Sequence, residues 1–231
     1  MSRRSKSPAV WGAAVVAGIV AFVSMSGTAG ASSGVATGEG AYRVAAVRGL
    51  AAEAGLPAAW GDFFALVAWR ESKGNPQAVN DSVSEAAAAA KAFDRNRERY
   101  EGCGHPEDAY TFGSGGWFGM LPANGLAQLG EELYCLPPSS VLEPRVALAM
   151  AVGFARGLMR WDGFAKVPTW LNLRTMWGRP AKGGDLAVLA KARVELAKDA
   201  AEVGLPASWL DGRPPPLPVT GAEVLDRLQA A

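Results

Sequence analysis

The sequence predicts a mainly α-helical protein. Apolar residues recur at helical spacing in several segments, long apolar runs end at glycine or proline, and no stretch shows sustained alternation of period two. Of the 231 residues, 49% are apolar, which suffices for one well-buried domain with extensions or for two small domains. The formal net charge is +1 with acids and bases intermixed, so the composition gives no indication of nucleic-acid binding.

Residues 1–31 have the pattern of an export signal. Arg3, Arg4 and Lys6 precede an uncharged run whose centre, residues 9–25, is apolar, and an A-x-A pattern follows at 29–31. The apolar centre is long for a cleaved signal and only just long enough to span a bilayer. We therefore expect an exported protein, in the periplasm, in the cell envelope or secreted. A cleaved signal peptide and a retained membrane anchor both stay open.

Cysteine and histidine are scarce. Cys103 and Cys135 are the only cysteines, and export permits disulfides. We expect them to pair, which would close a loop of about 31 residues and contribute roughly 3 kcal/mol; two free buried thiols are the alternative. The single histidine, His105, lies in the Gly-rich stretch 102–116 and is expected at the surface. Most multi-ligand zinc sites are thereby excluded, as are nucleophile–histidine schemes that do not use His105.

The first helix is expected after a Gly/Ser-rich linker at 32–40. Apolar residues recur at helical spacing over 42–54, and a glycine and a proline follow, as is typical of one helix ending and the next beginning. The same device recurs later, because residues 51–60 (AAEAGLPAAW) and 200–209 (AAEVGLPASW) differ at only two positions. We expect one helix–turn–helix arrangement used twice.

The central element is the helix that follows. Residues 58–69 are apolar nearly all round, with Asp62 the only charge, so this helix is expected in a core. It ends with Glu71, just before the helix-stopping run at 73–76. The residues three, four and seven positions before Glu71 are apolar, which puts its carboxyl on the buried face. Desolvation there would raise the pKa of Glu71 and favour a general acid; the alternative is a carboxylate that turns out to water.

Further helices are predicted from their periodicity and from their proline and glycine boundaries. They cover 85–101, 144–161, 168–177, 184–203 and 221–229. The segment 212–218, GRPPPLP, cannot be helical and is expected to form a stiff strap. In the segment 116–122, two glycines bracket Trp117 and Phe118, which allows a tight turn or a close approach to a ligand.

Three of these segments resemble one family. The run Glu71–Asn80, ESKGNPQAVN, is similar to the catalytic motif of lytic transglycosylases and goose-type lysozymes. The segment 116–122, GWFGMLP, resembles their Gly-aromatic-Gly motif, and 175–180, TMWGRP, falls where they carry Ala-Tyr-Asn-x-Gly-Pro. Two departures mark a divergent member: Pro122 replaces the usual glutamine, and the Tyr-Asn pair has no equivalent. The spacer between the first two motifs is also longer than in compact members.

The resemblance covers about residues 58–180 and implies a lysozyme-like helical domain over 41–182. A C-terminal helical extension with the Pro-rich strap would follow at 183–231. It implies cleavage of the MurNAc-GlcNAc β-1,4 bond of peptidoglycan, with Glu71 as the general acid and then the base. The N-acetyl group of the substrate would stabilise the cation, and the 6-hydroxyl would attack to give a 1,6-anhydro product. This scheme requires one carboxylate and no metal or cofactor.

The same resemblance implies the substrate contacts. Ser72 would orient Glu71 or the N-acetyl group, and the backbone of Gly119, Met120 and Leu121 would hold the sugar. Stacking candidates, each of which can instead be a core residue, are Tyr110, Trp117, Phe118 and Trp177. The expected partners are peptidoglycan glycan strands and, through a retained anchor, a membrane; we expect a monomer.

Three other functions stay open. A hydrolytic lysozyme of the same fold would use a second carboxylate near Glu71. Acids available for that role are Asp62, Asp81, Glu85, Glu107 and Asp108. A non-catalytic glycan-binding or structural module would explain the missing glutamine and Tyr-Asn pair. A membrane-bound scaffold has no support beyond the N-terminal segment. Both a bacterial enzyme that remodels its own wall and a phage enzyme that pierces a host wall fit the sequence.

Overall fold

The computed structural model describes residues 39–80, 82–95, 113–129 and 136–231. They belong to one compact unit, residues 35–231. The expected signal or anchor at 1–31 lies outside the described residues, as does most of the linker. Cys103, Cys135, His105 and Tyr110 also lie outside them. Within the described ranges, no helix has the length and apolar character needed to cross a membrane.

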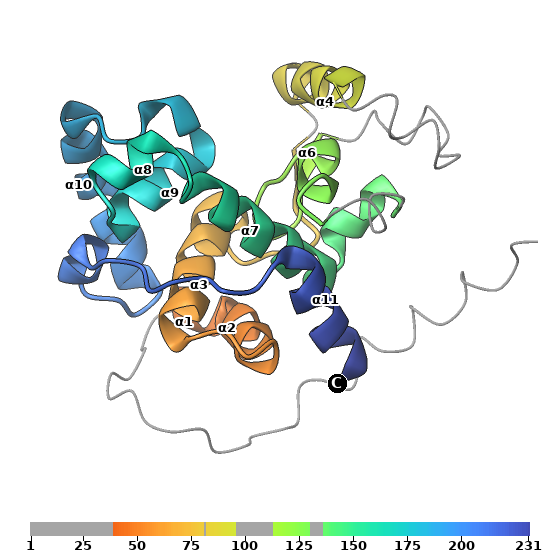
Figure 1. Cartoon of the computed structure of the whole chain (residues 1–231), viewed down its shortest axis with the longest axis horizontal. Helices are drawn as coiled ribbons and strands as arrows, with labels where there is room; N and C mark the ends of the chain where they lie inside the picture. The colour runs from red at the N-terminus through yellow and green to blue at the C-terminus, as the bar shows by residue number, and fades with distance from the viewer. Residues whose placement is uncertain (1–38, 81, 96–112, 130–135) are drawn as a thin grey trace, which may run out of the picture. The chain divides into compact units, whose positions relative to one another are not determined.

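The described chain is mainly α-helical, as the sequence predicted (Figure 1). The α-helices are α1 (Glu39–Arg43), α2 (Ala45–Glu53), α3 (Ala58–Ser72), α4 (Val83–Arg95), α6 (Pro122–Leu126), α7 (Pro144–Leu158), α8 (Asp162–Lys166), α9 (Trp170–Gly178), α10 (Leu186–Glu202) and α11 (Gly221–Ala230). Short 3-10 helices are η2 (Pro138–Leu142), η3 (Pro180–Lys182) and η4 (Ala207–Asp211). The strands β1 (Val79–Asn80) and β2 (Ser114–Gly115) form a small antiparallel sheet, although α4 lies between them in the chain.

Helix α3 forms the centre of the core, as its apolar sequence predicted. Its residues from Phe63 to Ala68 are fully buried, and α2 and α10 pack against it. Its aromatic rings interlock with α9, because the Trp60 and Phe63 ring centroids lie 4.9 and 5.2 Å from that of Trp170. The helix stops where the sequence indicated: Lys73 adopts a left-handed conformation with φ 53°, and the N–H of Gly74 donates to the carbonyl of Ala68 at 3.2 Å.

The C-terminal segments pack against the rest of the domain. Helix α11 lies along α7 (Figure 1) and buries Val224, Leu225 and Leu228. The Pro-rich strap before it is pinned to the core helix, because Nε1 of Trp60 donates to the carbonyl of Pro215 at 3.2 Å. Buried residues of 183–231 and of the predicted catalytic domain at 41–182 therefore belong to the same hydrophobic core.

The two similar ten-residue segments, 51–60 and 200–209, end their helices in the same way. In both copies a left-handed glycine follows the helix, Gly55 with φ 72° and Gly204 with φ 81°. The next leucine N–H then donates back to an alanine carbonyl, at 2.9 Å for Leu56 and 2.8 Å for Leu205. The copies differ afterwards, because the first continues into α3 and the second into the 3-10 helix η4.

Several predicted boundaries were wrong. The helix expected at 42–54 is split into α1 and α2, and α1 begins at Glu39, inside the predicted linker. The helix expected at 144–161 ends at Leu158, and α8 follows as a separate turn. The pairing of β1 with β2 was not predicted, since two-residue strands are too short to show alternation.

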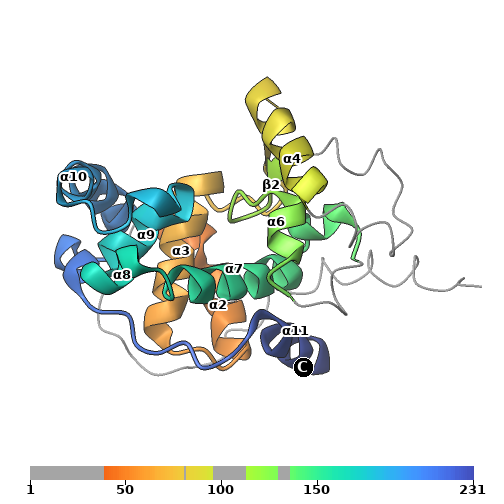
Figure 2. The same cartoon turned by 45° about the horizontal axis from the view of Figure 1, so that its top comes forward.

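Figure 2 shows α4 beside α6, with which it packs.

Candidate functional site

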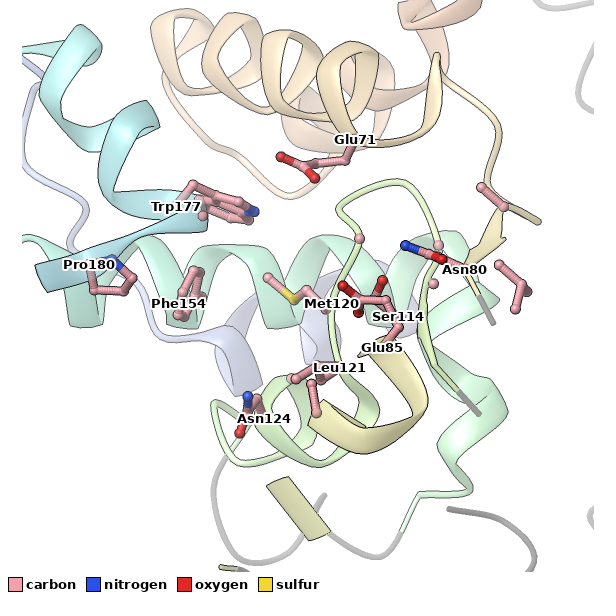
Figure 3. A pocket seen from close by; sticks show the side chains of 18 residues that line it. Glu71, Asn80, Glu85, Ser114, Met120, Leu121, Asn124, Phe154, Trp177 and Pro180 are labelled. Atoms are coloured by element: carbon pink, nitrogen blue, oxygen red, sulfur yellow. The ribbon is translucent and has the colours of Figure 1, made fainter. Parts of the chain in front are cut away.

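A pocket of about 540 Å³ opens beside the C-terminal end of α3 (Figure 3). Its walls come from the end of α3, the paired strands β1 and β2, the turn after β2, α4, α6, α7, the end of α9 and η3. The lining residues are Glu71, Ala78, Val79, Asn80, Glu85, Ala88, Ser114, Gly115, Gly116, Gly119, Met120, Leu121, Asn124, Gly125, Phe154, Trp177, Gly178 and Pro180. The lining thus combines the carboxylates of Glu71 and Glu85 and the amides of Asn80 and Asn124 with apolar side chains.

The turn Gly116–Gly119 brings backbone directly against Glu71. Both end glycines have left-handed φ values, 72° and 58°. Gly115 and Met120 close the turn with reciprocal backbone hydrogen bonds of 3.0 and 3.1 Å. A Cβ added to Gly119 would lie 3.1 Å from Oε2 and 3.3 Å from Cβ of Glu71. The left-handed φ and this close approach to Glu71 both favour glycine here, and the turn is the tight one that the sequence allowed.

Side chains from α3 and α9 hold this turn in place. The hydroxyl of Ser72 lies 2.9 Å from the carbonyl of Ala68 and 3.1 Å from that of Trp117, and its single proton is shared between them. The indole of Trp117 donates to the carbonyl of Gly74 at 3.1 Å, and that of Trp177 donates to the carbonyl of Phe118 at 3.3 Å. These contacts fix the turn relative to Glu71.

The predicted sugar contacts divide into two groups. Gly119, Met120, Leu121 and Trp177 line the pocket with Glu71. The side chains of Trp117 and Phe118 are buried, with 3% and 1% exposure, and do not line it. Of the two roles left open for these rings, stacking on a sugar or core packing, their burial favours core packing. The Ser72 hydroxyl contacts backbone carbonyls outside the pocket lining. Tyr110 lies outside the described residues.

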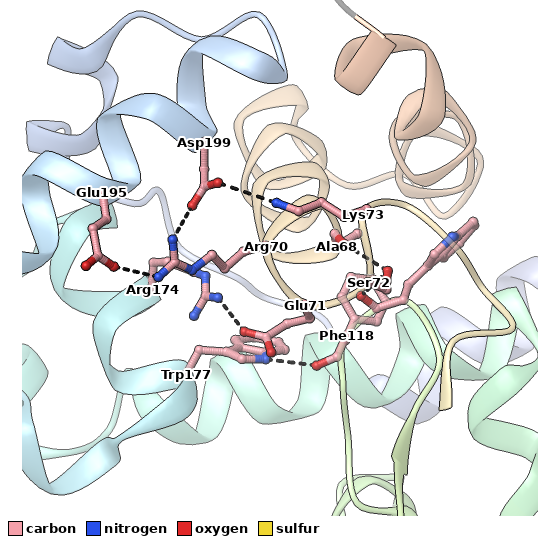
Figure 4. Close-up of polar contacts among 11 residues, drawn as sticks. Ala68, Arg70, Glu71, Ser72, Lys73, Phe118, Arg174, Trp177, Glu195 and Asp199 are labelled. Atoms are coloured by element: carbon pink, nitrogen blue, oxygen red, sulfur yellow. Dashed lines mark hydrogen bonds and ion pairs between the residues drawn. The ribbon is translucent and has the colours of Figure 1, made fainter. Parts of the chain in front are cut away.

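Glu71 is ion-paired, which the sequence did not predict. Nη2 of Arg174 donates to Oε1 of Glu71 (Figure 4). The Arg174 side chain is 7% exposed and that of Glu71 is 29% exposed. The expectation of a carboxyl desolvated among core residues was wrong, because Glu71 lies in the last turn of α3, where its side chain reaches the pocket wall.

Burial acts on Arg174 itself. Desolvation lowers the pKa of Arg174 below its usual value, and the neighbouring Glu71 charge opposes that shift. Its guanidinium nevertheless stays charged, because arginine starts far above neutral pH. The Nε of Arg174 is buried and has no hydrogen-bond partner among the residues that the structure describes. Arg174 is the only charged residue of the predicted helix 168–177, and a lone charge in an apolar helix is the signal that could have identified it.

A wider charged cluster surrounds this pair. Arg70 donates to Glu195 and to Asp199 at 2.7 Å each, and Nζ of Lys73 lies 3.8 Å from Asp199. The hydrogen bond to Glu195, and then that to Asp199, raise the pKa of Arg70, and the hydrogen bond from Arg70 lowers the pKa of Glu195. These contacts tie the end of α3 to α10, while Arg174 ties it to α9.

A second carboxylate, Glu85 at the start of α4, lines the pocket on the side opposite Glu71 (Figure 3). Its own N–H donates to Oγ of Ser82 at 3.4 Å, which forms one half of a capping box. Among the other acids considered from sequence, Asp62 pairs with Arg48 at 2.7 Å and is not among the lining residues. Asp81, Glu107 and Asp108 lie outside the described residues.

No family model, curated protein or solved structure matches this chain. The function is therefore argued from the geometry of the site. Within the described ranges, no group of three or more His, Cys, Asp or Glu side chains could hold a metal ion. The arrangement offers Glu71 and Glu85 for proton transfer, and Trp177, Phe154, Asn80 and Asn124 give the mixture of apolar and polar surface that is typical of small-molecule sites.

Proposed function

We propose that this chain has a lysozyme-like fold and cleaves the MurNAc-GlcNAc β-1,4 bond of peptidoglycan, with Glu71 as the general acid. One observation carries the proposal: the carboxyl of Glu71, at the end of the core helix, lies on the wall of a pocket of about 540 Å³ against the backbone of Gly119. The motif resemblance adds the substrate class, and export would bring the protein to the cell wall.

The proposed reaction uses one carboxyl group twice. Protonated Glu71 gives its proton to the glycosidic oxygen as the bond from C1 to that oxygen breaks. The carbonyl oxygen of the substrate N-acetyl group stabilises the positive charge at C1. Ionised Glu71 then takes the proton of the 6-hydroxyl, and O6 bonds to C1. The product is a 1,6-anhydro sugar, and Glu71 is left protonated for the next cycle.

The test is digestion of purified peptidoglycan by residues 32–231 and by the Glu71→Gln variant, with mass analysis of the products. We expect anhydro muropeptides from the wild type and a loss of at least about 100-fold in the variant, as for removal of a general acid. Glutamine keeps an oxygen that can accept from Arg174, so the variant should fold with a loss of about 1–3 kcal/mol in the free energy of unfolding.

Asp62→Asn is the matched control, because it removes a carboxylate from the same helix that pairs with Arg48 outside the pocket lining. It should keep full cleavage. A folded Glu71→Gln protein that cleaves at the wild-type rate would overturn the role of Glu71. A wild-type protein that pulls down the polymer without cutting it would mean a glycan-binding module.

Hydrolysis is a second candidate, and the position of Glu85 favours it. Inverting glycosidases place two carboxyl groups on opposite sides of the bond, with a water molecule activated by the second. Under our main proposal, Glu85→Gln should lower the rate of anhydro product formation by no more than about threefold, since no step requires Glu85. Loss of cleavage in Glu85→Gln, together with reducing-end products from the wild type, would establish hydrolysis instead.

A further inference from the structure

Arg174 binds one of the two carboxyl oxygens of Glu71. Its Nη2 donates to Oε1, while Oε2 lies on the side of Gly119 at the pocket. Arg174 comes from α9, 103 positions away from Glu71 in the sequence, and only 7% of its side-chain surface is exposed. A buried guanidinium in that place restricts the rotation of the carboxyl group, since turning Oε1 away would leave the cation without its anionic partner.

A charged cluster lies around this pair. Arg70 and Lys73 come from the end of α3, Glu195 and Asp199 come from α10, and Glu85 lies across the pocket. Asp199 is buried like Arg174, whereas Arg70, Lys73 and Glu195 are exposed. Arg70 and Lys73 pair with the carboxylates of α10, so among the described residues Arg174 is the cation that contacts Glu71.

We propose that Arg174 is the positioning residue of this site: by holding Oε1 it directs Oε2 of Glu71 to the pocket. This inference rests on the proposed function, because Oε2 is then the oxygen that passes the proton to and from the glycan. Loss of Arg174 should therefore lower kcat for cleavage with little change in KM.

The experiment compares kcat and KM of peptidoglycan cleavage for the wild type, Arg174→Met and Arg174→Lys. Removing the guanidinium frees the carboxyl group to rotate, so kcat should fall by about 10- to 100-fold in Arg174→Met while KM changes by less than about threefold. Arg174→Lys keeps a cation and should restore part of the lost kcat. Arg193→Met removes a cation of α10 that pairs with Asp211 of η4 and should leave both constants unchanged.

A second measurement tests the pair without any activity. Thermal unfolding is compared for the wild type, Glu71→Gln, Arg174→Met and the double variant. If the two side chains depend on each other, the Tm loss of the double variant should be smaller than the sum of the single losses by at least about 3 °C. Additive Tm losses would overturn the pairing itself.

The outcomes separate the two proposals. A wild-type protein that cleaves nothing sinks the proposed function, and the unfolding comparison then decides alone whether Arg174 holds Glu71. A cleaving wild type whose kcat is unchanged in folded Arg174→Met overturns the role of Arg174 and leaves the role of Glu71 standing. A lowered kcat with coupled Tm values supports both.

Discussion

At the scale of single residues, Gly119 determines how closely the backbone can approach Glu71. Its φ of 58° lies in the left-handed region, and its missing side chain leaves room for the carboxyl group. The tight turn also fixes the rings on either side, because Trp117 and Trp177 each donate to a backbone carbonyl. A single residue thus combines a conformational requirement with a steric one.

Gly119→Ala should therefore lower cleavage and stability together. The added Cβ, 3.1 Å from Oε2 of Glu71, must displace the carboxyl or the turn, and such misplacement reduces rates by about 10- to 100-fold. The left-handed conformation adds about 1–2 kcal/mol of destabilisation. Cleavage rate and Tm are the measurements. The control is Gly49→Ala in α2, where nothing lies within 4 Å and the change should stabilise the helix by about 0.5–1 kcal/mol. An unchanged rate in Gly119→Ala would contradict the steric argument.

The sequence identified Glu71 but not its environment. Glu71 was found because helix periodicity and the stop at 73–76 are local signals. Its partner Arg174 is 103 positions away, and a contact of that separation has no local signature. Glu85 was one of five available acids, and only the packing of α4 beside β2 and α6 distinguishes it. Burial of Trp117 and Phe118 was equally undetermined, since a turn between two glycines can expose or bury its rings.

At the scale of secondary-structure elements, local capping signals predicted helix ends well. The starts of α7 at Pro144 and of α11 at Gly221 agree with the sequence, and so does the end of α3. Prediction failed where the signal was tertiary. The two short strands pair Val79 with Gly115 across a long insertion. Strands of two residues form only because the surrounding helices bring them together.

Helix α11 has a complete capping box, and its stability should depend on pH. The backbone N–H of Thr220 donates to Glu223 at 2.6 Å and its hydroxyl at 2.9 Å, while the N–H of Glu223 donates back at 3.2 Å. The backbone hydrogen bond, and then the side-chain one, lower the pKa of Glu223 below its usual value. A lowered folded-state pKa means stability that is present above the ordinary glutamate range and is lost as pH falls below about 4.3.

The measurement is the Tm difference between the wild type and Glu223→Ala as a function of pH. We expect a difference of about 2–4 °C at pH 7 that closes as the pH falls toward 3. Asp226→Ala, in the same helix but outside the capping box, should show no such closing gap. A gap that stays constant across this range would mean that the carboxylate of Glu223 does not cap the helix.

At the scale of the whole molecule, the chain closes on itself through its last 19 residues. The strap contributes buried Leu217, Val219 follows directly after it, and α11 contributes Val224, Leu225 and Leu228 to the same core as α3. Arg227 also donates to the carbonyl of Ala54 at 3.0 Å, which connects the end of the chain to the end of α2. The pocket at the other end of α3 therefore depends on a core that the C-terminus completes.

Truncation after Gly212 should consequently unfold the domain. Exposing five buried aliphatic side chains removes about 10 kcal/mol of burial free energy, at roughly 2 kcal/mol each. This is comparable with the whole stability of a typical domain. Residues 32–212 should show no cooperative thermal transition by circular dichroism. Leu228→Ala, which truncates a fully buried residue, should cost about 2–4 kcal/mol. Leu186→Ala, at 72% exposure, should change stability by less than about 0.5 kcal/mol. A truncated protein that melts cooperatively at the wild-type temperature would show that the strap and α11 are an appendage, because a shared core cannot lose these side chains without losing stability.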